Sequence, residues 1–213
     1  GGGPLTTQRS HYPDPLVEAF AAAGAAAGHP TTEDYNGARQ EGAGLYQVTQ
    51  RRGRRCSAST AFLHPVLSRP NLKVLTGHRV TRLLLEGRRA AGVQVESRGG
   101  TVRIDARREV VLSAGVFGSP QLLMLSGIGP RDELGRHGID VALELPGVGA
   151  NLADHVDLAL VYRSSDPTLM GVTLRTALRA IPGYFQWRRS GRGLLTTNFA
   201  EAGAFLRTKP ELE

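Results

Sequence analysis

Apolar and polar side chains alternate along the middle of this chain, which indicates strands. The alternation covers Val80–Leu85, Ala91–Val95 and Thr101–Ala106, and glycine-containing turns separate the three segments. A period of two with tight turns between the segments predicts an antiparallel β-meander. Another short strand is expected at Leu72–Leu75.

The pattern changes to a continuous apolar run at Val110–Leu112. Such a run predicts a strand over Glu109–Ala114 that is buried on both faces. Small residues follow, and Ser119 and Pro120 have the chemistry of an N-cap and a first helical position. We therefore expect a strand, a turn and a helix in succession.

Helical spacing dominates the two ends of the chain. Asp14 and Pro15 predict a helix start, and Gly28 predicts its end. Leu174, Leu178, Ile181 and Phe185 recur at spacings of four, three and four, which predicts an amphipathic helix. Further helices are expected over 57–67 and 130–137, and strands over 44–49 and 200–206.

Composition and charge narrow the class of protein. Hydrophobic residues make up 40% and charged residues 21%, as in a globular protein, and no apolar run is long enough to predict a membrane-spanning helix. The net charge is +7, and residues 51–108 alone carry 14 basic and 3 acidic side chains. This block admits two interpretations, a solvated face or a surface that binds nucleic acid or another polyanion. The alternation of its arginines with apolar residues favours the solvated face, so we expect no nucleic-acid partner.

The cysteine, the histidines and the short sequence motifs exclude several kinds of site. Cys56 is the only cysteine, so no intrachain disulfide is expected. The histidines have no metal-ligand spacing, so we expect no metal site, and neither the Gly-x-Ser-x-Gly nor the Gly-x-Gly-x-x-Gly motif is present. The turn before the second helix suits an anion or a nucleotide, because helix N-termini expose backbone N–H groups. The alternative is a turn made of small residues for packing alone.

Four segments, in order, resemble the glucose–methanol–choline (GMC) family of FAD-dependent oxidoreductases, near its bacterial choline and alcohol dehydrogenases. They are DYNGARQEGAGLYQVTQRRGRRCSASTAFLHP at 34–65, RPNLKVLTGHRVTRLLLEGRRAAGVQV at 69–95, GVFGSPQLLMLSGIGP at 115–130 and LPGVGANLADH at 145–155.

The resemblance implies a fold and a domain division. The expected class is α+β to α/β, with part of a Rossmann-like FAD-binding domain at 69–155 and parts of the substrate domain at 1–68 and 156–213. The resemblance also implies a cytoplasmic flavoprotein that oxidises alcohols, with hydride passing to the flavin. It leaves open which alcohol is the substrate, what reoxidises the flavin, and the oligomeric state.

The resemblance further implies which residues contact FAD. Val80 would pair its backbone with the adenine, and Ser113, Ala114 and Gly115 would line the adenosine side. Asn151 and Leu152 would approach the isoalloxazine ring. The alternatives are a strand core residue at Val80, a packing turn at 113–115 and an Asx turn at Asn151.

Two family features are not among these 213 residues: the glycine-rich pyrophosphate motif and the catalytic histidine segment. The sequence therefore predicts a central fragment with no catalytic residue of its own. We expect it to bind FAD weakly or not at all, to oxidise no alcohol by itself, and to self-associate through exposed strand edges.

Overall fold

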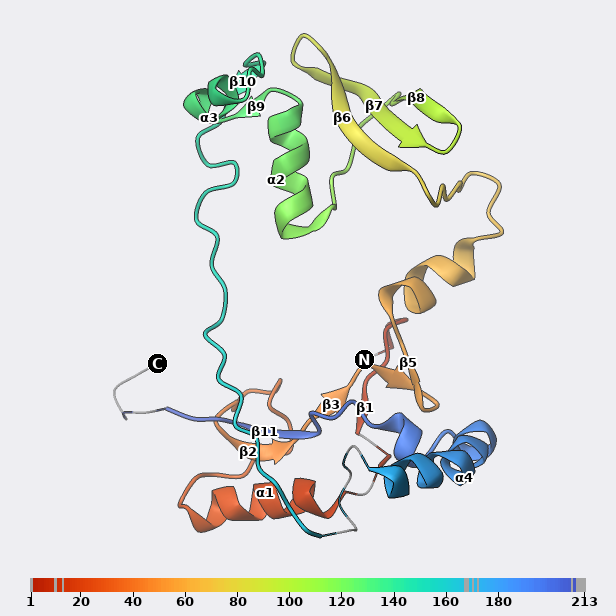
Figure 1. Ribbon diagram of the computed structural model, residues 1–213, viewed down its shortest axis with the longest axis vertical. Coiled ribbons are helices and arrows are strands. Elements are labelled where there is room, and N and C mark those ends of the chain that lie inside the picture. Colours follow the sequence, from red (N-terminus) through yellow and green to blue (C-terminus); the bar gives the residue numbers. More distant parts are fainter. Residues whose placement is uncertain are drawn as a thin grey trace. The chain divides into compact units, whose positions relative to one another are not determined.

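The computed structural model describes residues 2–9, 11–12, 14–166, 169, 171, 173–207 and 209. The chain forms two compact units. The first combines Gly1–Lys73 with Tyr162–Glu213, and the second is Val74–Val161. Figure 1 shows the elements of each unit, in which helices and strands are mixed as the predicted α+β character requires.

The first unit is built from short strands and two longer helices. Antiparallel pairing joins β2 to β11, β1 to β3 and β4 to β5. Its elements are β1 (Gln8–Arg9), α1 (Pro15–Ala26), β2 (Gly42–Leu45), β3 (Gln47–Val48), β4 (Gln50–Arg51), β5 (Arg54–Arg55), the short helices η1 (Ser59–Leu63) and η2 (His64–Val66), α4 (Leu174–Ser190), η3 (Leu194–Thr196) and β11 (Ala202–Phe205).

Helix α1 begins as the sequence predicts. The Asp14 carboxylate accepts a hydrogen bond from the Leu16 N–H at 3.0 Å, and Pro15 occupies the first turn. Gly28, just beyond the helix, has φ +87°. Along its length α1 packs against β2, where Gly24 leaves space for Ala43.

Replacing Asp14 with alanine should lower the free energy of unfolding by about 1 kcal/mol, because the N-terminal amide of α1 loses its cap. Urea denaturation followed by circular dichroism measures the change. Asp14→Asn is the control, since asparagine caps as well as aspartate, and it should unfold like the unaltered chain. Equal destabilisation by both replacements would contradict the capping role.

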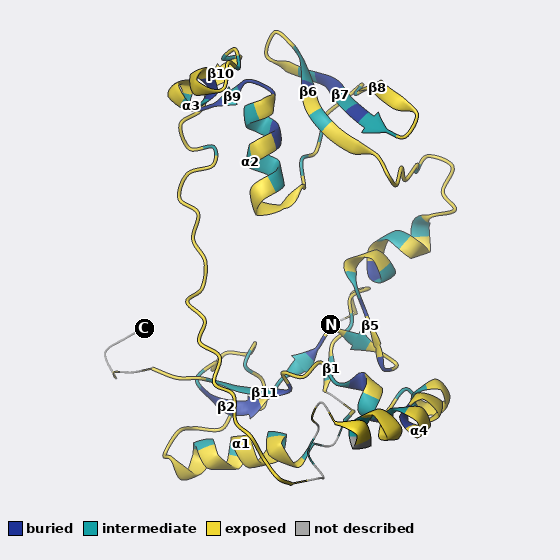
Figure 2. Ribbon diagram, in the orientation of Figure 1, coloured by how far each residue is buried: buried dark blue, intermediate teal, exposed yellow. Residues whose placement is uncertain are grey.

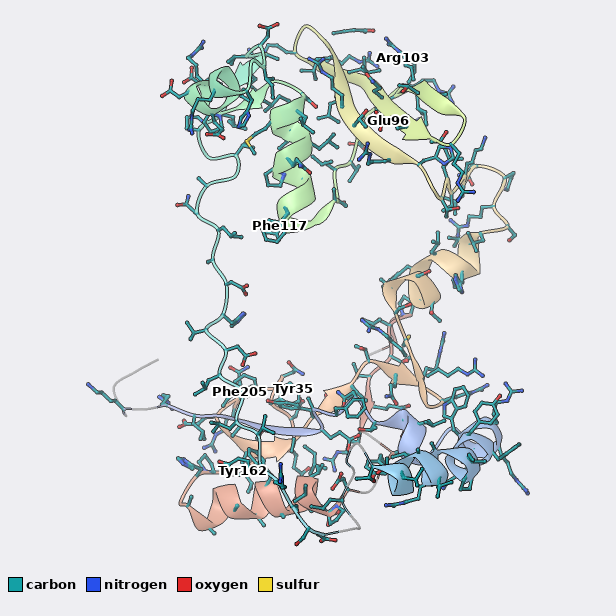
Figure 3. All side chains as sticks on the ribbon, viewed as in Figure 1. Tyr35, Glu96, Arg103, Phe117, Tyr162 and Phe205 are labelled. Atoms are coloured by element: carbon teal, nitrogen blue, oxygen red, sulfur yellow. The ribbon has the colours of Figure 1, made fainter. Side chains whose placement is uncertain are left out.

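The second unit contains the predicted β-meander. Strands β6 (Arg79–Glu86), β7 (Arg89–Ser97) and β8 (Gly100–Asp105) form an antiparallel sheet in that order, with β7 in the centre. Glu96 of β7 and Arg103 of β8 are labelled in Figure 3. Val95 of β7 is 2% exposed and lies at the centre of this unit's core.

A buried serine ties the sheet to helix α2 (Gly115–Leu125). The Ser126 hydroxyl accepts a hydrogen bond from the Leu83 N–H at 2.8 Å and donates one to the Leu122 carbonyl at 2.6 Å. Ser126 is 2% exposed, so both hydrogen bonds are shielded from water. They hold α2 against β6.

The remainder of this unit is a small parallel βαβ arrangement. Strand β9 (Ile128–Gly129) pairs in parallel with β10 (Leu143–Glu144), and α3 (Arg131–Arg136) connects them. Leu134 of α3 is 1% exposed and lies against Gly129. The helix ends before Gly138, which has φ +66°, as the sequence predicts.

Three predictions were wrong in detail. Residues 72–75 and 109–114 form no strand, and Val111 is 77% exposed. A strand needs a hydrogen-bonding neighbour, and none among the described residues pairs with these two segments. Helix α2 begins at Gly115, four residues before Ser119, whose hydroxyl instead accepts a hydrogen bond from the Ala114 N–H at 3.0 Å.

Both units expose large hydrophobic side chains, and Figure 2 shows long exposed stretches in yellow. The accessible surface is 16708 Å². Two separate domains of these lengths would expose about 11,500 Å². The excess includes Val116 and Phe117 of α2, which are 64% and 73% exposed. Among the described helices, none combines the length and the hydropathy needed to cross a membrane.

Candidate cofactor site

The residues expected to contact a nucleotide all lie in the second unit, Val74–Val161. Val80 is on β6, residues 113–115 precede and begin α2, and Asn151 and Leu152 follow the β10 segment. The structure describes all of them, and each can be compared with its alternative interpretation.

Val80 lies on an edge strand of the meander. It pairs with Val95 of β7, and no strand pairs with the other edge of β6 among the described residues. Alternate backbone N–H and C=O groups of such an edge point away from the sheet, where a planar ring with donors and acceptors can bind them. The side chain is 39% exposed, which does not fit the alternative of a core residue.

The turn at 113–115 is open to a ligand. Ser113, Ala114 and Gly115 are all exposed. Gly115 has φ +85°, a conformation that favours glycine, and a Cβ placed there would have nothing within 4 Å. The glycine is therefore required by the backbone conformation and not by crowding, and the space beside it is free.

Helix α2 offers its N-terminus at this turn. Its first turn contains no acidic residue, so the positive end of the helix dipole is not neutralised by the helix itself. Phe117 projects from this end of the helix into solvent (Figure 3). An anionic or flat ligand fits this environment, although the turn supplies no cationic side chain.

Asn151 and Leu152 begin an extended segment. Asn151 has φ +56°, in the left-handed region that asparagine tolerates, and Leu152 is 60% exposed. The loop before them is fixed on α2, because a Cβ at Gly149 would lie 3.4 Å from the terminal methyl of Met124.

The structure brings these groups to one helix without enclosing a pocket. Ser126 joins β6 to the C-terminal end of α2, and Met124 receives the 147–150 loop near the same end. The turn at 113–115 lies at the opposite end, about 16 Å away along an 11-residue helix. The six residues form an open surface, and none of them lines a cavity described below.

The cavities described for this chain are in the first unit, and no sequence motif predicts them. One of about 620 Å³ has Tyr35, Tyr46, Gln47 and Gln50 in its wall. Tyr35 stacks on Phe205, with ring centroids 5.9 Å apart (Figure 3). These residues come from distant parts of the sequence, so spacing alone does not reveal the cavity.

Cys56 is 2% exposed and lies between β5 and the helical segment that contains η1. Hydrogen bonding with Thr6 lowers the pKa of its thiol, and Arg51 adds a smaller electrostatic effect in the same direction.

Comparison with known proteins identifies the family. The sequence model of the GMC oxidoreductase family matches residues 3–157, most of this chain. This chain belongs to the GMC oxidoreductase family. The resemblance that the four sequence segments carry is thereby confirmed.

Two GMC relatives that this chain is similar to are bacterial. The oxygen-dependent choline dehydrogenase of Rhizobium etli is 46% identical over 211 residues, covering 99% of this chain and 38% of the relative. The alcohol dehydrogenase [acceptor] of Pseudomonas putida is 42% identical over 200 residues, covering 93% of this chain and 36% of the relative. The chain thus spans somewhat more than a third of the length of these relatives.

A solved structure shows the same fold. The FAD-dependent oxidoreductase from Chaetomium thermophilum is 31% identical, with a TM-score of 0.73, and the match covers 92% of this chain and 34% of that one. That oxidoreductase is therefore similar to this chain in both sequence and fold.

Proposed function

We propose that this chain is part of an FAD-dependent oxidoreductase that acts on the CH–OH group of a small alcohol. One observation carries the proposal: 46% identity, over 99% of the chain, to a GMC protein named choline dehydrogenase. The second relative is named for alcohol oxidation and the structural relative for FAD. Neither name favours the alternative of nucleic-acid binding.

The proposal assigns the two units to the two domains of a GMC enzyme. Val74–Val161 would supply part of the Rossmann-like FAD-binding domain, and the other unit part of the substrate domain. The sequence placed this boundary at residues 69 and 155. Exposed apolar surface on both units supports self-association as a further expectation. A cytoplasmic location, which the resemblance to the family implies, is part of the same proposal.

In this proposal the chain binds and orients the cofactor. The edge of β6 at Val80 would pair with the adenine, and the open turn at Ser113–Gly115 would receive the adenosine side. Asn151 and Leu152 would lie along the isoalloxazine ring. A bound FAD supplies the hydride acceptor for alcohol oxidation.

The test is a titration of the purified chain with FAD, ADP and riboflavin, followed by flavin fluorescence and competition. We expect weak binding of FAD and ADP and weaker binding of riboflavin, because the contacts lie mainly on the adenosine side. The 213 residues contain no glycine-rich pyrophosphate motif, so most of the cofactor would remain in water. Tight, stoichiometric binding of FAD would contradict the expected weak binding. Dye reduction with choline that is faster than with free flavin would contradict the expected lack of activity.

Gly115→Ala should weaken the binding of FAD and ADP about tenfold, because alanine is strained at φ +85° and the turn would change shape. Gly135→Ala is the matched control. Gly135 lies in α3, where a Cβ has nothing within 4 Å and φ is not positive. The control should bind like the unaltered chain. Unchanged binding by Gly115→Ala would remove the turn from the proposed cofactor site.

A further inference from the structure

Close backbone contacts join the β4–β5 hairpin to the C-terminal end of α4, and Figure 1 shows the two side by side in the first unit. The Trp187 indole N–H donates a hydrogen bond to the Gly53 carbonyl oxygen at 2.8 Å. A Cβ at Gly191, which ends α4 with φ +66°, would lie 2.7 Å from the Arg52 carbonyl oxygen. Because only glycine allows this approach, the hairpin and the helix end are held in one arrangement.

This contact brings arginines from two distant parts of the sequence to one cavity, whose volume is about 570 Å³. The arginines in its wall come from the hairpin and from the end of α4, and all are exposed: Arg52, Arg54, Arg188, Arg189 and Arg192. The guanidinium carbon of Arg54 lies 4.8 Å from the centre of the Trp187 ring, within the range of a cation–π interaction. Trp187 therefore holds this guanidinium group at the cavity.

No described carboxylate forms an ion pair with any of these five arginines. Exposed arginines elsewhere do have such partners, since Arg79 pairs with Glu96 and Arg131 pairs with Glu144 at 3.0 Å. The sequence gives the reason, because residues 42–85 and 167–200, which contain the hairpin and α4, include no Asp or Glu. The carbonyl end of the helix offsets only about half a unit of charge. The cavity wall therefore keeps a large positive charge.

We propose that this cavity binds a small anion that carries phosphate. A planar guanidinium group donates paired hydrogen bonds to phosphate oxygens, and an anion would also relieve the repulsion among the five like charges. The volume is within the range of small-ligand sites. A nucleic-acid strand fits less well, because it needs a basic groove along its backbone and aromatic faces for its bases, and Arg54 already lies over the Trp187 ring.

The test uses Trp187 as its reporter, because this is the only tryptophan in the chain. The chain is titrated at low ionic strength with inorganic pyrophosphate, inorganic phosphate and glycerol phosphate. Each should change the fluorescence of Trp187, and pyrophosphate should bind most tightly because it carries the most charge. The affinities should fall as salt is raised. The ranking of phosphate against its glycerol ester shows whether the site prefers a free anion or a phosphorylated molecule.

The double variant Arg188→Gln/Arg189→Gln should bind pyrophosphate about tenfold more weakly, because each exposed charge contributes about threefold. Arg107→Gln/Arg108→Gln is the matched control. It also replaces two adjacent exposed arginines and changes the net charge equally, but it lies in the second unit. The control should bind like the unaltered chain.

Circular dichroism checks that each variant folds. If the double variant does not fold, Arg192→Gln decides, since this residue lies beyond the end of α4 and its replacement should weaken binding about threefold.

Three outcomes would overturn the proposal. The first is a Trp187 fluorescence that does not respond to pyrophosphate. The second is an equal loss of affinity in the double variant and its control, which would mean that net charge alone attracts the anion. The third is salt-dependent binding of a single-stranded oligonucleotide by a chain that binds no pyrophosphate, which would assign the arginines to nucleic acid.

The result is separate from the proposed oxidoreductase function. Trp187 belongs to the first unit, whereas the candidate cofactor residues belong to the second. Gly115→Ala, which should weaken the binding of FAD, should leave the response of Trp187 to pyrophosphate unchanged. A chain that binds pyrophosphate but no FAD would contradict only the proposed cofactor site, and the reverse result would contradict only the arginine cavity.

Discussion

Replacing Leu134 with alanine should lower the free energy of unfolding of the Val74–Val161 unit by about 3 kcal/mol. Leu134 is 1% exposed and packs from α3 onto Gly129 of β9. The replacement leaves a cavity between the helix and the small parallel pair, and the lost contacts are not regained from water. Strands β9 and β10 precede the loop that leads to Asn151. The affinity for FAD should therefore decrease as this unit becomes less stable.

Leu143→Ala is the matched control, because Leu143 lies in the adjoining β10 but is 46% exposed. It should lower stability by less than about 1 kcal/mol. Urea denaturation of both variants, with amide hydrogen exchange to locate the change, makes the comparison. If both replacements lowered the free energy of unfolding by similar amounts, Leu134 of α3 would not be part of a packed core.

Replacing Gly92 with alanine should lower stability by about 3 kcal/mol through overpacking. Gly92 lies in the central strand β7, opposite Asp105 of β8. A Cβ at this position would approach the Ile104 carbonyl oxygen to 2.3 Å and the Asp105 Cα to 3.0 Å. Both atoms belong to the backbone of the neighbouring strand, so β8 must move away and ladder hydrogen bonds must lengthen.

Gly99→Ala tests the same chemical change in the turn between β7 and β8. The nearest atom to a Cβ there is the Ser97 hydroxyl at 3.8 Å, and φ is not positive. This variant should be neutral or slightly more stable, since alanine reduces the freedom of the unfolded chain. Thermal unfolding of the pair separates the two effects. An unchanged melting temperature for Gly92→Ala would show that β8 accommodates the new methyl group with no loss of stability.

Local sequence signals were sufficient wherever an element is stabilised by its own neighbours. The meander from Arg79 to Asp105 follows from alternation and turn glycines, because antiparallel hairpins pair residues that are close in sequence. The start of α1 follows from Asp14 and Pro15 for the same reason. Capping and pairing between residues close in sequence are enough to determine these two elements.

Sequence patterns gave wrong predictions where an element needs a hydrogen-bonding partner from a distant part of the chain. The apolar run at 110–112 was typical of a buried strand, yet Val111 is 77% exposed, because no described strand lies beside it. A cap-like serine at 119 was equally misleading, because Ser119 bonds to the Ala114 N–H from inside the helix. The helix had already begun at Gly115, four residues before this serine.

By itself the sequence determined the family, the meander, the amphipathic character of 174–185 and the residues to consider for FAD. Motifs and periodicity carry that information, because they depend on residue order alone. Only the tertiary structure decided that Val80 lies on an edge strand and that Ser126 and Met124 join β6 and the 147–150 loop to α2. The structure also decided that the apolar face predicted for α4 points outward, because Trp187 and Gly183 bind the other side of the helix to Gly53 and Leu194. These results depend on contacts between residues more than 40 positions apart or on different elements, and no local pattern encodes which face of an element such contacts will cover.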